Sequence, residues 1–224
     1  MTRTFLLTTI AAGGFAFSAP AAVIDFNDPA IQGTAITSVS SDDGTVTASV
    51  SAIGGTDQAV VFDTTATRTA DPDLQDPFRL TDEAGPGTVR PGGVLIVQER
   101  DLSIGGPDDN ARGGVLSFVF DQVIDFTGFR IFDGAVVTVS TSSGASAVFS
   151  VDEPPNQNYG NRVYGEFSFT GLFDGISDLT FDIRGSGAID DLQVAAIPVP
   201  ATLPLLIAGI GGLGFAARRR RKAA

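Results

Sequence analysis

The sequence predicts an all-β protein: an antiparallel, jelly-roll-like β-sandwich that follows a cleavable signal peptide and precedes a single membrane-spanning C-terminal helix. Three observations predict this. Apolar and polar residues alternate in short segments, turn dipeptides separate those segments, and both ends of the chain are apolar. Nothing before Ala201 has the pattern of a long amphipathic helix. The roughly 175 residues between the two ends are enough for one domain with its own core.

Residues 1–21 have the plan of a secretory signal peptide. Arg3 is followed by an apolar stretch and then by the small-residue pattern Ala19-Pro20-Ala21, which predicts cleavage after Ala21. The alternative is a retained membrane anchor, but a span needs about 20 apolar residues and the stretch from Phe5 to Phe17 is shorter. We therefore expect the mature chain to begin at Ala22.

Residues 22–195 form the predicted β-sandwich body. Period-two alternation, rich in β-branched and aromatic residues, occurs in the segments GTVTASVSAI, VLSFVF, AVVTVS, ASAVFSV, EFSFT and LTFDIR. Turns are predicted between strands at Asp133-Gly134, Ser143-Gly144, Asp174-Gly175 and Gly185–Ala188. Segments 63–91 and 152–161 are predicted loops, and the loops of a sandwich usually gather at one end, where ligands bind.

The body is strongly acidic. It holds eight arginines, no lysine and all 26 acidic residues, so its net charge is 8 − 26 = −18. Such a surface excludes nucleic acid as a partner, because phosphate neutralisation supplies most of that affinity. It is also repelled by anionic lipid. The acids favour a hydrated surface, and some of them could bind divalent cations.

The residue inventory leaves little enzyme chemistry to the body. The chain has no His and no Cys, which excludes Ser-His, Cys-His and zinc-histidine sites, and the body has no Lys for a Ser-Lys dyad. A carboxylate pair of the glycosidase kind remains conceivable, with Glu99 and Glu166 as its members. We expect the body to be non-enzymatic.

Calcium is the one cofactor that the sequence suggests, since Ca²⁺ prefers hard oxygen ligands. Three acidic segments are candidates: DPDLQD at 71–76, the region from Glu99 to Asn110, and Asp190-Asp191 together with Asp25. We expect one structural Ca²⁺ that ties the first strand to the last through Asp25 and Asp190. Weaker candidate ligands are Glu99, Asp108 and Asp109. The alternative for each segment is a solvated turn.

The C-terminal segment 196–224 has three parts. These are the pentapeptide Ile197, Pro198, Val199, Pro200, Ala201, then seventeen uncharged residues at 201–217, then the basic run Arg218, Arg219, Arg220, Arg221, Lys222. A seventeen-residue helix is about 25 Å long, just short of an average hydrocarbon core. The basic run is expected to keep the C-terminus in the cytoplasm. A permanent single-span anchor is the plainer alternative.

This order of parts resembles the PEP-CTERM sorting signal, in its VPLPA-type variant of Gram-negative bacteria. Ile stands for Val at the first position and Val for Leu at the third. The resemblance implies that an exosortase, a membrane-embedded cysteine protease, processes the exported chain and releases it or transfers it to the cell surface. Such proteins are associated with exopolysaccharide and with biofilm or floc matrix. The resemblance covers only the last 28 residues.

The body shows a looser resemblance. The segment 92–120 is similar to uncharacterised PEP-CTERM protein bodies, and GSGAIDDLQV at 185–194 resembles the last strand of lectin-type jelly rolls, where an Asp often helps to hold structural Ca²⁺. Sugars stack on exposed Trp and Tyr, of which the chain has only Tyr159 and Tyr164.

We therefore expect an exported, non-enzymatic protein of the cell surface or extracellular matrix. Its expected partners are an exosortase-type membrane protease, the export machinery and exopolysaccharide. Two alternatives stay open: a lectin-like carbohydrate-binding module and a polysaccharide-active hydrolase.

Overall fold

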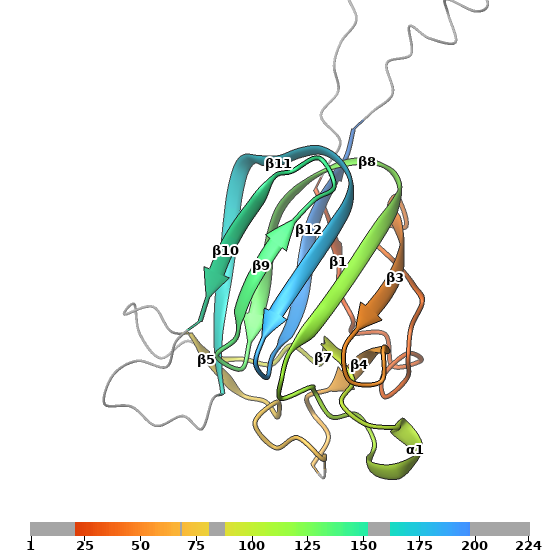
Figure 1. Cartoon of the computed structure of the whole chain (residues 1–224), viewed down its shortest axis with the longest axis vertical. Helices are drawn as coiled ribbons and strands as arrows, with labels where there is room; N and C mark the ends of the chain where they lie inside the picture. Colours follow the sequence, from red (N-terminus) through yellow and green to blue (C-terminus); the bar gives the residue numbers. More distant parts are fainter. Residues whose placement is uncertain (1–20, 68, 81–87, 152–161, 198–224) are drawn as a thin grey trace, which may run out of the picture. The chain divides into compact units, whose positions relative to one another are not determined.

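The computed structural model describes residues 21–67, 69–80, 88–151 and 162–197. These residues belong to one compact unit, Pro20–Ile197. The described residues form twelve strands and one short helix, which Figure 1 labels in part. They are β1 Ala22–Ile24, β2 Ser38–Ser40, β3 Thr47–Ile53, β4 Ala59–Asp63, β5 Phe78–Leu80, β6 Thr88–Val89, β7 Gly93–Val97, α1 Leu102–Gly105, β8 Gly114–Phe132, β9 Val136–Ser140, β10 Ser146–Ser150, β11 Val163–Arg184 and β12 Ala188–Ala196.

The strands form one curled, almost entirely antiparallel sheet, which confirms the predicted all-β class. Its main path is β10-β9-β11-β8-β12-β7-β4, with β3 on β8 and β1 on β12. The exception is β5, which pairs with β11 in the parallel direction. The predicted sandwich of two stacked sheets is not shown, because hydrogen bonds connect all twelve strands into a single sheet.

The two longest strands bend sharply. β8 has 19 residues and β11 has 22, and both turn over at the top of the view in Figure 1. Their mutual pairing shifts register between Ser168 and Asp178, at the bend. Gly171 and Gly175 adopt φ angles of 73° and 66° there, which residues other than glycine rarely adopt. The turn predicted at Asp174-Gly175 is therefore wrong, because β11 continues through it as a bent strand.

Phenylalanine fills the inside of the curl. Phe126 lies at the centre of this cluster, with ring contacts to Phe129, Phe169, Phe173 and Phe181. Phenylalanine is fully buried at nine described positions: 26, 62, 78, 118, 126, 129, 132, 173 and 181. Burial of aromatic and aliphatic side chains is the main source of stability in a body without disulfides.

The first and last strands pair, as predicted. β1 lies antiparallel to β12, with Ala22 opposite Val194 and Ile24 opposite Leu192. β12 is an interior strand, since it also pairs with β8 and β7. It ends at Ala196, and the Ile197 N–H donates to the Val123 carbonyl at the bend of β8.

We expect Gly93→Ala to destabilise the body and Gly105→Ala to leave it nearly unchanged. A Cβ at Gly93 would overlap the backbone carbonyl of Phe26, whereas a Cβ at Gly105 would meet no atom within 4 Å. Neither glycine has a positive φ, so the difference tests packing space alone. Overpacking typically costs about 1–3 kcal/mol. Urea unfolding measures both variants, and equal stabilities would contradict the tight approach of β7 to Phe26.

Candidate functional site

The bend of β8 brings both ends of that strand to the β11–β12 turn. Gly113, just before β8, lies against the Ile183 carbonyl and the Gly185 N–H, while Gly187 lies against the Phe132 carbonyl at the other end of β8. The long β4–β5 connection and the β7–β8 connection with α1 lie at this same end (Figure 1). We call it the loop end of the body. The predicted loop 63–91 is wrong in part, because β5 and β6 lie within it, and the predicted loop 152–161 lies outside the described residues.

Four acidic residues interact electrostatically at the loop end, and we call them the loop-end cluster: Asp71, Asp73, Asp109 and Asp133. In the described segments, no three acids are placed to hold a metal ion. Asp71 and Asp73 come from the β4–β5 connection, Asp109 precedes β8, and Asp133 follows it. Asp133 begins the β8–β9 turn with a φ of 68°, a conformation that Asp tolerates. The cluster therefore joins three loops through one group of acids.

Ser186 and Gly187 hold two members of the loop-end cluster. The Ser186 hydroxyl contacts Asp109 Oδ2 at 2.8 Å and also Asp133 Oδ2. The Gly187 N–H donates to Asp109 Oδ2. A hydroxyl carries one proton, so Ser186 can donate to only one of the two carboxylates at a time.

The loop-end cluster is buried and electrostatically strained. Asp71, Asp109 and Asp133 are only 4%, 6% and 3% exposed. Burial raises the pKa of Asp71 to about 10, helped by its hydrogen-bonding contacts with the carboxyls of Asp73 and Asp109. Burial likewise raises the pKa of Asp133 to about 7 and raises that of Asp109. Without a counter-ion, these groups hold protons well above the usual Asp range.

Among the described residues, the partners of the loop-end cluster satisfy only some of its carboxylate oxygens. Asp71 Oδ2 and Asp133 Oδ1 are buried and accept no hydrogen bond from any described donor. None of the five ion pairs found in the described segments includes a member of the loop-end cluster. Such an arrangement can hold shared protons.

The predicted ligands Asp25 and Asp190 lie in a second acidic group, where the first and last strands pair. Asp190 is 1% exposed, and burial, then the charge of Asp191, then that of Asp25, raise its pKa well above the usual value. Arg130 lies in this group. It forms ion pairs with Asp191 and, at 3.3 Å, with Glu166. The structure thus brings Asp25 and Asp190 into one group, and the calcium site proposed for them stays a prediction.

The weaker candidate calcium ligands, Glu99, Asp108 and Asp109, do not all contact the same residues. Glu99 and Asp108 both pair with the exposed Arg100, at 3.0 and 3.3 Å. The Asp109 carboxylate instead binds Ser186 and Gly187. Glu99 and Glu166, the carboxyls of the alternative glycosidase pair, contact different arginines in the described part of the chain, so no shared ion-pair partner joins them there.

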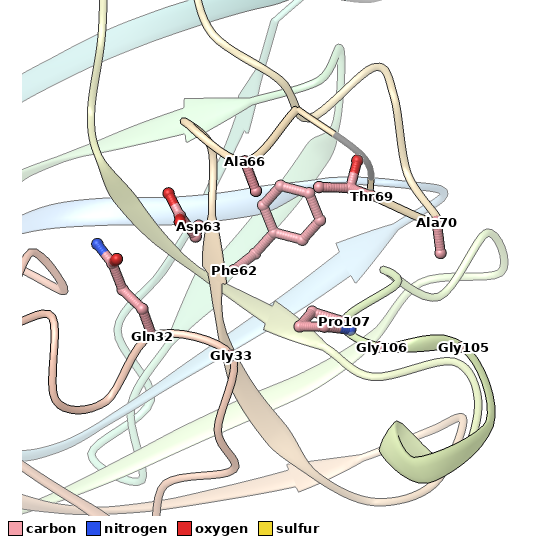
Figure 2. A pocket seen from close by; sticks show the side chains of 10 residues that line it. All are labelled: Gln32, Gly33, Phe62, Asp63, Ala66, Thr69, Ala70, Gly105, Gly106 and Pro107. Carbon is pink, nitrogen blue, oxygen red and sulfur yellow. The ribbon is translucent and has the colours of Figure 1, made fainter.

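A pocket of about 230 Å³ lies beside the loop-end cluster (Figure 2). Ala70 and Pro107 line it and directly precede Asp71 and Asp108, and Figure 2 shows the Phe62 ring among the lining side chains. Ligand pockets usually measure about 300–1,000 Å³. This pocket is smaller and has no exposed Trp or Tyr in its lining, which gives a sugar ring little to stack on.

Asp133 and Ser186 are not among the predicted site residues. The sequence indicates only a turn at Asp133, and Ser186 lies in a turn predicted from its glycines. Asp71 and Asp73 lie in one of the three acidic segments that the sequence indicates, and Asp109 lies in another. The contact between those two segments is what the structure adds.

The last described residues, Ala196 and Ile197, belong to a segment that matches a family model. Residues 196–221 match the model of the PEP-CTERM protein-sorting motif. The chain carries a PEP-CTERM sorting domain. No curated protein and no solved structure matches the chain.

The PEP-CTERM domain makes this chain an exported protein that an exosortase processes, with a C-terminal sorting signal that passes into the membrane. Within the motif, Ile197 is described and is 38% exposed. Residues 198–201, the span 201–217 and the basic run 218–222 lie outside the described residues, as does Ala19 of the predicted signal peptide. In the segments that are described, no helix is long and apolar enough to cross a membrane.

Proposed function

We propose that this PEP-CTERM protein is a non-enzymatic component of the cell surface or extracellular matrix. The observation that carries the proposal is the position of the sorting motif, which starts at Ala196, the last residue of β12. In this proposal the signal peptide directs export, the basic tail stays in the cytoplasm, and exosortase cleavage near residues 197–201 frees the β body.

Cleavage at this place preserves the fold. The last fully buried residue of β12 is Val194, and the predicted recognition residues come after it. The protease would therefore remove no side chain from the described core. A hydrated body with a net charge of −18 suits a loose, water-rich matrix.

We propose further that the bent sheet closes as a jelly-roll-like sandwich. Phe129, in the second half of β8, packs its ring on Phe149 of β10 at 5.1 Å and on Phe181 of β11 at 5.4 Å. β10 and β9 hydrogen bond on the side of the second half of β11, whereas β12 hydrogen bonds to the second half of β8. These ring contacts support two facing layers around one core.

The described site supports neither of the two alternatives, the lectin-like module and the polysaccharide-active hydrolase. Tyr164 is buried and stacks on Phe132, so it is not available to a sugar. Among the described residues, the exposed large apolar side chains include no aromatic ring. Glycan-array binding would favour the lectin-like module. Polysaccharide turnover that Glu99→Gln or Glu166→Gln abolishes would favour the hydrolase.

We expect the mature protein to lack residues 1–21 and the segment after about Ala201. The reason is the sorting motif, whose membrane span and basic run the exosortase separates from the body. Mass spectrometry of both ends of the surface protein measures this, together with any attached glycan. An intact basic tail on most of the surface protein would contradict processing and favour the permanent anchor.

A further prediction concerns the positive charge of the C-terminal basic run. Replacing Arg218–Arg221 and Lys222 with Ser should impair retention of the membrane intermediate, because the positive residues oppose translocation of the C-terminus. Replacing the exposed Arg184 with Ser should leave processing unchanged. If the unmodified chain, the variant with the serine tail and the Arg184→Ser variant are all processed equally, the result would count against the sorting model.

A further inference from the structure

We propose that the free edge of β10 is a self-association site, where a second copy of this chain adds its own β10 in the antiparallel direction. The two chains would form a symmetric dimer in which one sheet continues into the other. The proposal rests on the β body alone and is independent of the proposed place of the protein in a matrix.

β10 is the strand at one end of the main path of the sheet, and Figure 1 shows it beside β9. In the part of the chain that the structure describes, its residues 146–150 pair with β9 and with no other segment. Two backbone hydrogen bonds flank this hairpin. The Thr141 N–H donates to the Ala145 carbonyl, and the Val151 N–H donates to the Ala135 carbonyl.

These two bonds determine which backbone groups of β10 stay free. Residues that bond to the neighbouring strand alternate with residues that do not along an antiparallel pair. Since positions 145 and 151 bond inward, Ala147 and Phe149 do the same. The residues between them, Ser146, Val148 and Ser150, therefore direct their N–H and C=O groups away from β9.

The opposite end of the main path is covered by the chain itself. Segment 33–36 runs along β4, where the Gly33 N–H donates to the Val61 carbonyl and the Ile36 N–H donates to the Ala59 carbonyl. Proteins usually protect an edge strand in this way, or with charged residues, Pro or a bulge. β10 has the sequence SAVFS and pairs with β9 in an unbroken register, so it uses none of the last three devices.

The β9–β10 hairpin is also the place where two acidic bodies can meet with least repulsion. No charged residue occurs from Gly134 to Val151, which is the longest uncharged run in a body with a net charge of −18. Like charges directly opposite each other destabilise a strand pair. Pairing through β10 brings no such charges together.

The sequence of β10 is self-complementary in the antiparallel direction. With a two-fold axis at Val148, the two copies of Val148 face each other, and Ser146 faces Ser150 of the partner subunit. These are the three residues with free backbone groups, so this register uses all of their hydrogen-bonding capacity. On the other face it sets the small Ala147 opposite the large Phe149. A symmetric dimer requires a surface that is complementary to itself.

Several apolar side chains at this edge are only partly covered. Val148 is 66% exposed. The half-buried Phe149 ring lies 5.1 Å from the ring of Phe167 and 5.6 Å from that of Phe169, and both of these are half-buried too. A second β10 would cover Val148 on the outer face and Phe149 on the inner face. Burial of apolar surface is the main favourable contribution to association.

The test is the monomer–dimer equilibrium of the full chain in detergent, measured by analytical ultracentrifugation. Val148→Lys should raise the dimer Kd at least about tenfold, which corresponds to about 1.4 kcal/mol, because it sets like charges opposite each other. Val148→Pro should have a similar effect, because it removes an N–H that β9 does not use. The matched control is Val119→Lys, at a 58% exposed valine of the interior strand β8, and should leave Kd unchanged. Circular dichroism confirms that each variant is folded.

A single cysteine locates the contact. The chain has no Cys, so Val148→Cys introduces the only thiol, and a short bismaleimide should cross-link it to the thiol of a second copy. Val119→Cys should not cross-link. Amide hydrogen exchange at Ser146, Val148 and Ser150 should be fast in the dilute monomer and slow in the dimer.

Salt separates this uncharged contact from an electrostatic one. Raising NaCl from about 0.1 M to about 1 M shortens the Debye length from about 10 Å to about 3 Å and should strengthen the dimer, because it screens the repulsion between two acidic bodies. The proposal is overturned if the chain stays monomeric at every concentration, if salt weakens the dimer, if the dimer survives both Val148→Lys and Val148→Pro, or if Val148→Cys does not cross-link. Slow exchange of the three amides in the monomer would also overturn it, and would show that the chain covers this edge itself.

Discussion

In chelator, the free energy of unfolding of this PEP-CTERM protein should fall as the pH is raised from about 5 to about 8. The buried acids of the loop-end cluster are the main cause, and Asp190, whose pKa burial also raises, acts in the same direction. In the unfolded chain every Asp ionises near its ordinary pKa of about 3.9. In the folded body the pKa of Asp133 is about 7 and that of Asp71 about 10, chiefly because burial disfavours the charged form. The folded state therefore binds more protons across this window, and stability decreases with rising pH.

Each such group contributes on the order of 1 kcal/mol per pH unit between its unfolded and folded pKa. For Asp133 the loss is complete above pH about 7, and for Asp71 it continues toward 10. Asp43 and Asp101 have lowered pKa values because backbone and side-chain hydrogen bonds stabilise their charged forms, so they act only at lower pH. Urea unfolding across the window measures the slope.

Asp133→Asn is the informative variant, because an amide cannot ionise. It should flatten the slope below pH about 7 and raise the stability near pH 8. The matched control is Asp28→Asn, at an exposed acid outside both buried groups. Stability that rises from pH about 5 to about 8 in the unmodified chain would show that the loop-end acids are ionised at little cost.

The second large effect should come from Phe126→Ala, with a loss of about 3–5 kcal/mol in the free energy of unfolding. Phe126 is 1% exposed and contacts four other rings at 5.3–6.0 Å. Removal of the ring leaves a cavity between the two halves of the curl, since neighbouring rings on bent strands cannot collapse into it freely.

Phe149→Ala removes the same atoms from a half-buried position on β10, the strand at the end of the main path. We expect less than half of the effect there. Urea unfolding with unchanged m-values gives the comparison. If the two variants lose equal stability, Phe126 is not the centre of the core.

Period-two alternation predicts those strands that have one buried and one exposed face. β3, whose burial alternates residue by residue, is predicted in this way. β7 is not, because all five of its residues are buried and the alternation is absent. Asp174-Gly175 indicates a turn between two strands because Asp and Gly favour turns, whereas β11 uses Gly175 to bend without ending.

The loop-end cluster can be predicted from the sequence only in pieces. The sequence indicates that Asp71 and Asp109 each lie in an acidic loop, but not that bent β8 and β11 bring these loops to Asp133 and Ser186. Asp109, Asp133 and Ser186 are far apart along the chain, and the strand register of the whole sheet determines that they come into contact. The sorting motif is the opposite case, because all its parts are contiguous and can be recognised without a fold.

The place of β12 in the sheet sets the order of events during export. β12 is the last strand of the body, yet it lies in the interior of the sheet between β8 and β7 and also holds β1. A chain that crosses the membrane from its N-terminus delivers this strand only after the other eleven have passed. The sheet therefore cannot close until residue 196 is outside, where the sorting motif begins. Until β12 pairs, β8 and β7 expose unpaired strand edges, and the incompletely folded body is vulnerable to proteases and aggregation. Folding of the body is thus coupled to arrival of the signal that the exosortase reads.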